Sequence, residues 1–323
     1  MSLLSSVRRR RTAAVAGLSA AALVALSACS SSSASAPPID GGGAGGHLSA
    51  YNKIITAGPV ASDSEINANA WAKKIKQQGY LKVGGTDSGP LFSLRDLKSG
   101  ELTGFDAGLS QMLAHYITGK TDVKALTKLT ITSVDTRETM LQNNTVDAVF
   151  ATYSITPERA QKVDFAGPYY QSGDSIMVKK GNTSITSVKD LNGKTVATES
   201  NSTAALAVHK LAPKAHVLLF KDDAQCVAAV QQGRADAYVL DQGILLGDAL
   251  SNPAVQVVGG DPFTVDPYGI GLNKQSGAKP FVNAFLKKIF ASGDWAKLYK
   301  ATIGTVVKGK APTPPKIGSV PGS

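Results

Sequence analysis

Three positions in this sequence could bind the charged groups of a small ligand. Arg159 lies on a short predicted helix, and a guanidinium can hold a carboxylate through two parallel hydrogen bonds. Asp241 ends the apolar run Val239-Leu240, so its carboxylate emerges at the carboxyl edge of a predicted strand. Ser202 and Thr203 open a predicted helix, where backbone N–H groups favour an anion. Two alternatives stay open: Arg159 as a surface side chain and Asp241 as an N-cap.

Residue types that catalysis or metal binding usually needs are sparse. The four histidines (His47, His115, His209 and His216) are scattered, and neither they nor the two cysteines have the spacing of a metal site. We therefore expect no catalytic residue, no metal and no cofactor. The second cysteine, Cys226, has no intramolecular partner once Cys29 is assigned to lipid, and we expect a buried, unreactive thiol.

The N-terminal segment has the layout of a secretory signal. A basic cluster, Arg8 to Arg11, precedes an apolar run from Thr12 to Leu26 that is too short to span a bilayer comfortably. The run ends in Leu26-Ser27-Ala28-Cys29, which is typical of a bacterial lipoprotein signal cleaved before an acylated cysteine. We predict a signal peptide over 1–28, lipidation of Cys29, a flexible tether over 29–63 and a location on the extracytoplasmic face of the cell membrane.

The net charge of +10 does not predict nucleic-acid binding. Four of the positive charges, Arg8 to Arg11, leave with the signal, and no basic run with interleaved aromatic residues remains.

The elements after the tether alternate between helices and short β-rich runs. We predict a helix over 64–78, followed by two cycles of strands and helices, which indicate an α/β fold with mainly parallel sheets. Asp106 is expected to cap a helix over 106–116. The two cycles share a phrase that runs helix, turn, strand: Leu141 to Val149 in the first and Val230 to Tyr238 in the second. Two similar α/β lobes explain this better than one large sheet.

Several motifs then carry a family resemblance. They are Gly104-Phe105-Asp106, Ser154-Ile155-Thr156-Pro157-Glu158-Arg159, Val163 to Tyr170, Asp190 to Lys194, Gly233 to Ala237, Tyr268 to Gly271 and Gly293-Asp294-Trp295. In this order, over about residues 64 to 306, the chain resembles the family 3 extracellular solute-binding proteins, the polar amino-acid binding proteins of ABC importers.

The resemblance implies a two-lobed fold of the type II periplasmic-binding-protein class, with two hinge strands and the ligand enclosed between the lobes. Lobe 1 is expected to comprise 64–170 and 268–306, and lobe 2 to comprise 171–267. The Pro/Gly-rich residues 307–323 are expected to form a disordered tail. The expected partners are an amino acid, the permease subunits of an ABC importer and the membrane through the lipid, but no nucleic acid, and the protein is expected to be a monomer.

The resemblance also assigns roles to single residues. Arg159 stands where the family binds the ligand carboxylate, and Ser202-Thr203 supply the second half of that site. Asp241 stands where the family binds the ammonium, as do Thr152 and Ser154. Asn201 replaces the usual glycine of the Ser202-Thr203 turn, and asparagine tolerates a left-handed backbone.

The evidence for the ligand's side chain is thinner. Arg137 resembles an arginine that reaches the distal carboxylate in glutamate and aspartate binders, although it could instead hold Asp135 or a loop. Arg95 follows a first-lobe loop similar to that of acidic amino-acid binders, although an exposed hairpin would also explain it. A second cation favours glutamate, aspartate, glutamine and asparagine, in that order.

Two other functions use the same fold. A small branch of the family resembles cyclohexadienyl dehydratases, and Glu199 is the candidate general acid or base for such an enzyme. The arginine and acid at 159 and 241 argue against this, and we expect no enzyme. A sensor module would use the same ligand site without an importer.

Overall fold

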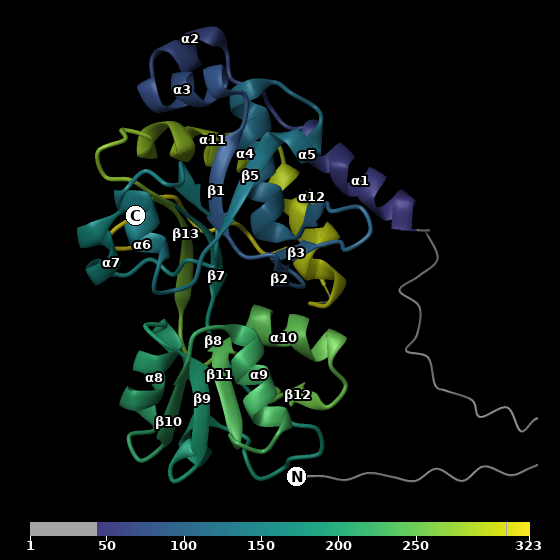
Figure 1. The fold of residues 1–323 in the computed structure, drawn as a ribbon, viewed down its shortest axis with the longest axis vertical. Helices are drawn as coiled ribbons and strands as arrows, with labels where there is room; N and C mark the ends of the chain where they lie inside the picture. Colours follow the sequence, from purple (N-terminus) through teal and green to yellow (C-terminus); the bar gives the residue numbers. More distant parts are fainter. Residues whose placement is uncertain (1–43, 308) are drawn as a thin grey trace, which may run out of the picture. The chain divides into compact units, whose positions relative to one another are not determined.

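The computed structural model describes residues 44–307 and 309–323. The predicted signal peptide, Cys29 and the tether up to residue 43 lie outside the described residues. The described chain forms two α/β lobes, each built on a five-stranded sheet (Figure 1), which confirms the predicted two-lobed fold class. The sheets are mixed rather than mainly parallel as predicted, because the hinge crossings bring in strands that pair antiparallel with their neighbours. Among the described residues, no helix has the length and apolar character that a membrane crossing requires.

The first lobe has a mixed sheet of strand order β5-β1-β6-β13-β7. β1 (Leu81–Gly85) lies between β5 (Thr127–Ile131) and β6 (Ala148–Val149) and runs parallel to both. β13 (Asp266–Leu272) and β7 (Asp164–Ser172) complete the sheet in antiparallel pairing. Parallel strands end at one edge of the sheet, so the loops after them converge there.

Helices cover the sheet of lobe 1, and the lobe also contains a small, separate hairpin sheet. The helices are α1 (Ala44–Thr56), α2 (Asp63–Asn67), α3 (Ala70–Gln78), α4 (Phe105–Thr118), α5 (Val123–Leu126), α6 (Arg137–Gln142), α7 (Pro157–Lys162), α11 (Lys279–Ala291), α12 (Asp294–Ala301) and the 3₁₀ turn η2 (Ile303–Thr305). The small sheet consists of β2 (Ser88–Gly89), β3 (Ser93–Arg95) and β4 (Leu102–Thr103).

The second lobe has the strand order β10-β9-β11-β8-β12. Its strands are β8 (Asp174–Lys179), β9 (Thr195–Glu199), β10 (His216–Phe220), β11 (Ala237–Asp241) and β12 (Val255–Val257). Its helices are the 3₁₀ turn η1 (Val188–Leu191), α8 (Thr203–Leu211), α9 (Asp223–Gln231) and α10 (Gln242–Ser251). Cys226 lies buried on α9, as the sequence predicts.

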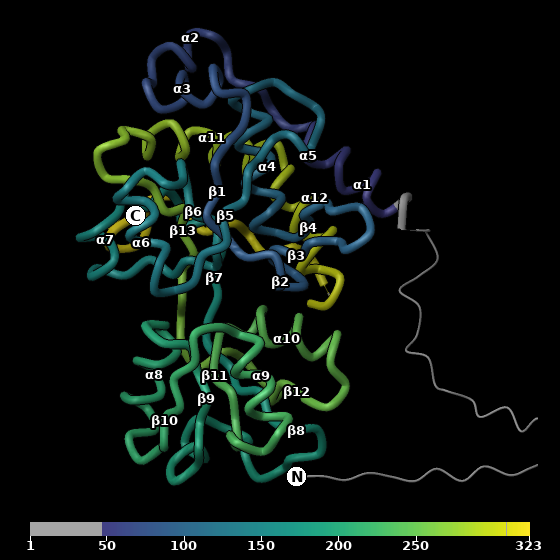
Figure 2. Tube along the Cα trace, in the orientation of Figure 1, coloured from purple at the N-terminus to yellow at the C-terminus, as the bar shows by residue number. Residues whose placement is uncertain are grey.

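The two lobes have separate hydrophobic cores and are joined by two chain crossings. One core runs from Tyr51 to Ile303 on the first sheet, and the other, from Ile176 to Val255, fills the second lobe. The Cα trace (Figure 2) crosses between the lobes where β7 leads into β8 and again where β12 leads into β13. We call β7 and β13 the hinge strands.

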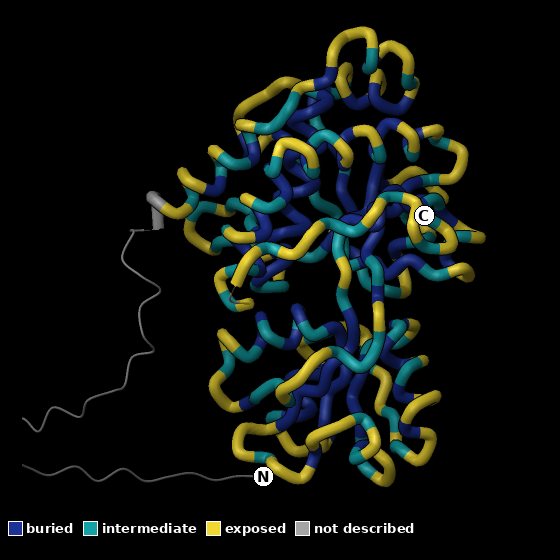
Figure 3. The backbone as a smooth tube through the Cα atoms, turned by 180° about the vertical axis from the view of Figure 1, so that it is seen from behind, coloured by how far each residue is buried: buried dark blue, intermediate teal, exposed yellow. Residues whose placement is uncertain are grey.

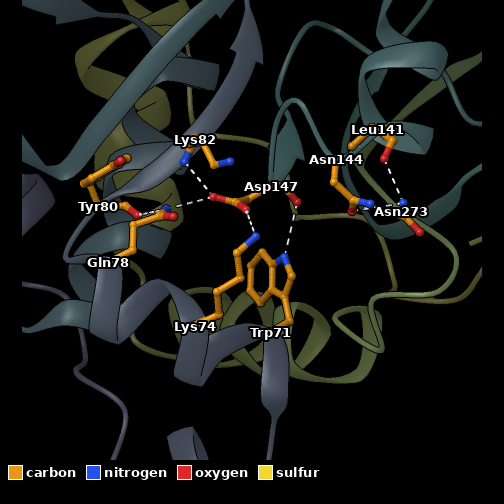
Figure 4. A network of polar contacts seen from close by, with 9 residues as sticks. All are labelled: Trp71, Lys74, Gln78, Tyr80, Lys82, Leu141, Asn144, Asp147 and Asn273. Carbon is orange, nitrogen blue, oxygen red and sulfur yellow. Dashed lines mark hydrogen bonds and ion pairs between the residues drawn. The ribbon is translucent and has the colours of Figure 1, made fainter.

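The repeated sequence phrase positions one aspartate in each lobe to fix the start of a neighbouring strand. Asp147 donates its backbone N–H to the Lys82 carbonyl and accepts the Lys82 N–H on its carboxylate (3.0 Å). Asp236 makes the same pair of bonds with Thr195 in lobe 2. Figure 4 shows that Lys74 and Gln78 also reach the Asp147 carboxylate, while Trp71 donates to its backbone carbonyl.

The chain before lobe 1 differs from the predicted tether. Residues 44–56 form helix α1, and Tyr51 and Ile55 on it are fully buried against lobe 1. Tyr51 also donates its hydroxyl to the Gly104 carbonyl at 2.8 Å. The Gly/Ser-rich composition hid this helix, because two large apolar side chains supply enough buried area to order the segment.

The C-terminal tail also differs from its predicted disorder. Figure 3 shows it running across lobe 1 to the C-terminus. Ala311 and Ile317 pack against the lobe 1 core, and Val320 packs against a smaller cluster that contains Tyr153. The Gly318 N–H donates to the carbonyl of Gly167 on β7 at 2.8 Å. The proline and glycine content of this segment suggested disorder, but its few apolar side chains pack against lobe 1 and hold the segment in place.

Two local predictions were also wrong. The predicted helix over 64–78 is divided into α2 and α3, because the Asn69 side chain accepts from the Ala72 N–H and starts a new helix. Asp106 does not cap α4, whose N-cap is Gly104. The Asp106 carboxylate is instead buried, where it accepts the Thr152 N–H (2.6 Å) and the Tyr169 hydroxyl (2.7 Å).

Candidate functional site: an interlobe cleft

A cavity of about 380 Å³ lies between the two lobes. Lobe 1 lines it with the β2–β3 hairpin and with the loops that follow β5 and β6, and lobe 2 lines it with the ends of β9 and β11 and the start of α9. We call it the distal cavity. Its charged lining residues are Asp87, Arg137, Glu199, Lys221, Asp222 and Asp223.

The predicted ligand residues gather beside this cavity. A second, smaller space of about 20 Å³ is lined by eleven residues from both lobes. Seven of them were predicted from the sequence: Arg137, Thr152, Ser154, Arg159, Ser202, Thr203 and Asp241. We call these seven residues the clamp. Arg137, Thr152 and Glu199 line both spaces, so they lie where the clamp meets the distal cavity.

Arg159 is a buried side chain that spans the two lobes. It is only 8% exposed, which excludes the surface alternative. Thr156 caps α7 by accepting the Arg159 N–H, and Pro157 is the first residue of that helix. The guanidinium donates to the Ser154 carbonyl in lobe 1 (2.9 Å) and to the Asn201 carbonyl in lobe 2 (3.0 Å).

Arg137 is buried beside it on the same lobe. Its guanidinium carbon lies 3.8 Å from the centroid of the Tyr153 ring, and one Nη donates to the Ala151 carbonyl at 3.1 Å. Its Nε is buried and has no hydrogen-bond partner within the described chain. Asp135, which the sequence offered as an alternative partner, instead accepts hydrogen bonds from lobe 2.

Tyr153 is the residue that sequence reasoning missed in lobe 1. Both guanidinium groups lie near its ring, with Arg159 at 5.4 Å, and the ring itself stacks edge-on with Phe165. An aromatic face attracts a cation, so Tyr153 holds the two arginines together without neutralising either. The sequence showed a tyrosine between two expected ligand contacts, which also suits a core residue.

The two arginines have no acid partner in their own lobe. Within the described residues neither of them forms an ion pair, and both are buried. Burial lowers the pKa of both, and their mutual repulsion lowers the pKa of Arg137 further, to about 10. Buried charges in proteins are normally paired, so this lobe presents a site for an anion.

Asp241 faces the arginines from lobe 2. It is 5% exposed, and it holds the N-cap position of α10 without making a side-chain capping bond. Capping therefore does not occupy the carboxylate, and its Oδ1 is buried without a partner in the described chain. Burial, and then the nearby Asp266, raise the pKa of Asp241 to about 6. A ligand cation would relieve both effects.

The turn before α8 has the expected backbone. Asn201 has φ +56°, so asparagine provides the left-handed conformation in place of glycine. Ser202 caps the helix by accepting the Ala205 N–H, which uses one lone pair of its hydroxyl. The Thr203 hydroxyl lies 3.5 Å from that of Ser154 in the opposite lobe. Thr152 also has a positive φ, +45°, and its N–H is held by Asp106.

Arg95 is not brought to the cleft. It ends β3, on the hairpin that the sequence offered as the alternative, and does not line either of the two interlobe spaces. Its Nε donates to Asp87 at 3.0 Å and its Nη1 to the Gly100 carbonyl. It can influence the cleft through Asp87, whose charge it balances.

Lobe 2 contributes an acidic wall that sequence reasoning did not assign to ligand binding. Glu199 ends β9 as Asp241 ends β11, and it lines both interlobe spaces. Burial, followed by the charge of Asp223, raises the pKa of Glu199 to about 8, against the opposing effect of Arg137. The sequence offered Glu199 only as the general acid or base of an alternative enzyme, and it did not predict a role in ligand binding.

The lobes contact each other on both sides of the cleft. Ser200 and Asn201 of lobe 2 donate side-chain hydrogen bonds to Asp135 of lobe 1. On the other side of the cleft, Ile244 packs against the cores of both lobes. Polar bonds therefore bridge one side of the cleft and apolar packing bridges the other.

Comparisons with known proteins agree with this geometry. The family model described as bacterial extracellular solute-binding proteins, family 3, matches residues 81–305. The chain is 36% identical over 263 residues to the ABC transporter glutamine-binding protein GlnH of Bacillus subtilis, covering 79% of this chain and 94% of that protein. It is 38% identical over 205 residues to a glutamine-binding protein of Geobacillus stearothermophilus, covering 63% and 76%.

Solved structures show the same fold. A cysteine-binding protein from Campylobacter jejuni superimposes with a TM-score of 0.68 at 26% identity, covering 75% of this chain and 97% of that one. An ancestral amino acid-binding protein described as a precursor of cyclohexadienyl dehydratase gives a TM-score of 0.62 at 33% identity, covering 72% and 98%.

Proposed function

The chain belongs to the bacterial extracellular solute-binding proteins of family 3, and we propose that it captures glutamine between its lobes and passes it to the permease of an ABC importer. The observation that carries this proposal is the opposite charge of the two lobes at the cleft. Lobe 1 presents two buried arginines without acid partners, and lobe 2 presents Asp241 and Glu199.

The clamp matches the main-chain end of a free amino acid. The Arg159 fork suits the α-carboxylate, and the Thr203 end of α8 adds a hydroxyl and helix N–H groups. The unpartnered Oδ1 of Asp241 suits the ammonium. The clamp space of about 20 Å³ is too small for these groups. Binding therefore requires the carboxylate to replace the Asn201 carbonyl at Arg159.

The distal cavity favours a side-chain amide over a carboxylate. A carboxamide offers one acceptor and one N–H₂ donor, which match Arg137 and Glu199 at the junction of the two spaces. At a pH where Glu199 is ionised, a glutamate side chain would put its negative charge beside that carboxylate and beside Asp222 and Asp223. The sequence analysis ranked glutamate ahead of glutamine because it considered only the second arginine of lobe 1. The acids of lobe 2 favour the opposite ranking, with glutamine ahead of glutamate.

Calorimetric titration of the purified protein with the twenty amino acids tests this proposal. We expect glutamine to bind most tightly, glutamate more weakly, and the shorter asparagine and aspartate more weakly again. Tight binding of only lysine, arginine or histidine would refute the amide assignment, and binding of no amino acid would refute the clamp.

The transport role has its own test. Cells that lack the protein should take up labelled glutamine more slowly, and the intact gene should restore uptake. Unchanged uptake would favour the sensor alternative. The relatives are named as binding proteins, so we also expect the purified protein to release no product from prephenate or arogenate.

We further propose that Cys29 anchors the protein to the outer face of the cell membrane as a lipid-bearing monomer. The basic cluster, the apolar run and the small residues before Cys29 support this assignment. Labelled palmitate should enter the wild-type protein but not Cys29→Ala, which should be released from the membrane fraction. Equal labelling of both forms would contradict the assignment.

A further inference from the structure

Three buried aspartates meet where the hinge strands enter lobe 2. Asp174 begins β8, Asp241 ends β11 and Asp266 begins β13. One carboxylate oxygen from each lies within 4.8 Å of the other two. Their exposed fractions are 0%, 5% and 6%. We call these three residues the hinge triad, a cluster of carboxyl groups that water reaches poorly.

Asp174 is the member that the hydrogen-bond network does not explain. Neither of its carboxylate oxygens has a partner within the described chain. Asp266, by contrast, accepts a hydrogen bond from the Thr264 hydroxyl. A buried carboxylate without a donor is costly, so Asp174 points to a missing positive group.

Backbone contacts fix the main chain at Asp174, so the segment cannot shift to move this side chain away from the other two acids. Its N–H donates to the Thr264 hydroxyl (2.6 Å), and its carbonyl accepts the Phe263 N–H (2.9 Å). The preceding residue, Gly173, lies so close to the Thr264 carbonyl that an added Cβ would stand 2.2 Å from that oxygen. In the sheet, Asp174 lies directly opposite Asp241.

We propose that the hinge triad binds a hard divalent cation of the calcium class. No lysine, arginine or histidine of the described chain forms an ion pair with any of the three acids. The donors are all oxygens, because the triad holds three carboxylates and Thr264 adds a hydroxyl. Such a set suits Ca²⁺ or Mg²⁺ and lacks the nitrogen and sulfur ligands that zinc and copper prefer.

Calcium fits the triad better than magnesium. Ca²⁺ accepts irregular geometry at 2.3–2.6 Å, whereas Mg²⁺ demands near-ideal octahedral ligands and retains several waters, which this buried position cannot easily admit. The cation also leaves Asp241 usable in the clamp, because a carboxylate can bridge a metal ion through one oxygen and an ammonium through the other.

Calcium titration of the chelator-treated protein tests the proposal. We expect one Ca²⁺ to bind, with a Kd in the range of about 10⁻⁴ to 10⁻³ M that is typical of extracellular modules. Tb³⁺, used as a luminescent probe, should be displaced by Ca²⁺ with the same midpoint. Asp174→Asn should weaken Ca²⁺ binding at least tenfold, while the exposed Asp261→Asn on the neighbouring loop should bind as the wild type does.

Thermal unfolding provides the second readout, because a ligand that binds the native state raises Tm. Ca²⁺ should raise the Tm of the wild type and of Asp261→Asn but not that of Asp174→Asn. Without calcium, Asp174→Asn should be at least as stable as the wild type, which shows that it folds. Absence of saturable binding, a normal response of Asp174→Asn, or equal stabilisation by Na⁺ at matched ionic strength would each overturn the proposal. Glutamine titrations are separate, so either proposal can fail alone.

Discussion

The two lobes share one scaffold but carry opposite charges at the cleft. Each has a five-stranded sheet, and each uses an aspartate, Asp147 or Asp236, to fix the start of a neighbouring strand. At the cleft, lobe 1 buries two arginines, while lobe 2 buries Asp241 and half-buries Glu199. Neither lobe can satisfy its own charges, so a zwitterion between them satisfies both.

This difference explains why the site belongs to the closed form. Arg159 donates to a carbonyl of each lobe, so its surroundings change when the lobes separate. A ligand that binds the closed form more tightly than the open one shifts the population toward closure. The charge contrast thus couples capture to lobe motion.

Of all the substitutions considered, removal of the Arg159 guanidinium should reduce glutamine affinity the most. Arg159→Ala should weaken glutamine binding by about 100-fold or more, because the ligand carboxylate loses its bidentate partner. The substitution also leaves a buried cavity in lobe 1. Calorimetry measures the loss. Lys162→Ala, on the exposed face of the same helix, is the matched control and should bind normally. A folded Arg159→Ala protein with normal affinity would remove this residue from the clamp.

Glu199 should determine how the preference for glutamine over glutamate changes with pH. Its pKa of about 8 means that it is protonated at pH 7, when it can donate to a ligand carboxylate, and ionised at pH 9, when it repels one. The preference for glutamine over glutamate should therefore rise by about tenfold from pH 7 to pH 9. Titrations of Glu199→Gln should show no such rise. The same pH dependence in both proteins would place the titrating group elsewhere.

The same residue should leave a signature in stability. Its folded pKa of about 8 exceeds the ordinary value of 4.5, so the folded protein binds more protons than the unfolded chain between these limits. The free energy of unfolding contributed by Glu199 should fall as pH rises from about 4.5 to 8. Glu199→Gln should flatten this part of the curve measured by urea unfolding without ligand. An unchanged slope would show that Glu199 does not titrate in this range.

The exposed bridge at Asp135 should have the smallest effect. Asp135→Ala removes the acceptor of two hydrogen bonds from lobe 2, and solvent already competes for these groups. Glutamine affinity should fall about threefold through a smaller closed population, which small-angle X-ray scattering can measure. Asp122→Ala, exposed on the far part of lobe 1, should change neither. A larger loss would mean that the bridge controls closure.

The sequence predicted those features that depend on local pattern. The short helix that carries Arg159, the strand that ends at Asp241 and the left-handed turn at Asn201 follow from neighbouring residues. Seven of the eight predicted ligand residues lie together, while Arg95 does not, because its hairpin directs it to Asp87.

Features that depend on how side chains from different elements pack together were not predictable. Tyr153 looked like a core residue until two arginines, 16 residues or fewer away, were found on its ring. Glu199 gained its role from Arg137 in the opposite lobe. Helix α1 and the tail were misjudged because composition averages over the few apolar residues, such as Ile55 and Val320, that actually dock.

The positions of the tryptophans have a practical consequence for anyone who follows this protein in solution. The sequence contains two, and both belong to lobe 1: Trp71 donates to the Asp147 carbonyl and Trp295 to that of Tyr169. Intrinsic fluorescence therefore reports on one half of the molecule. If the halves denature separately, emission and far-ultraviolet circular dichroism will give different midpoints, and the gap between the two curves will measure how independently lobe 2 holds its structure.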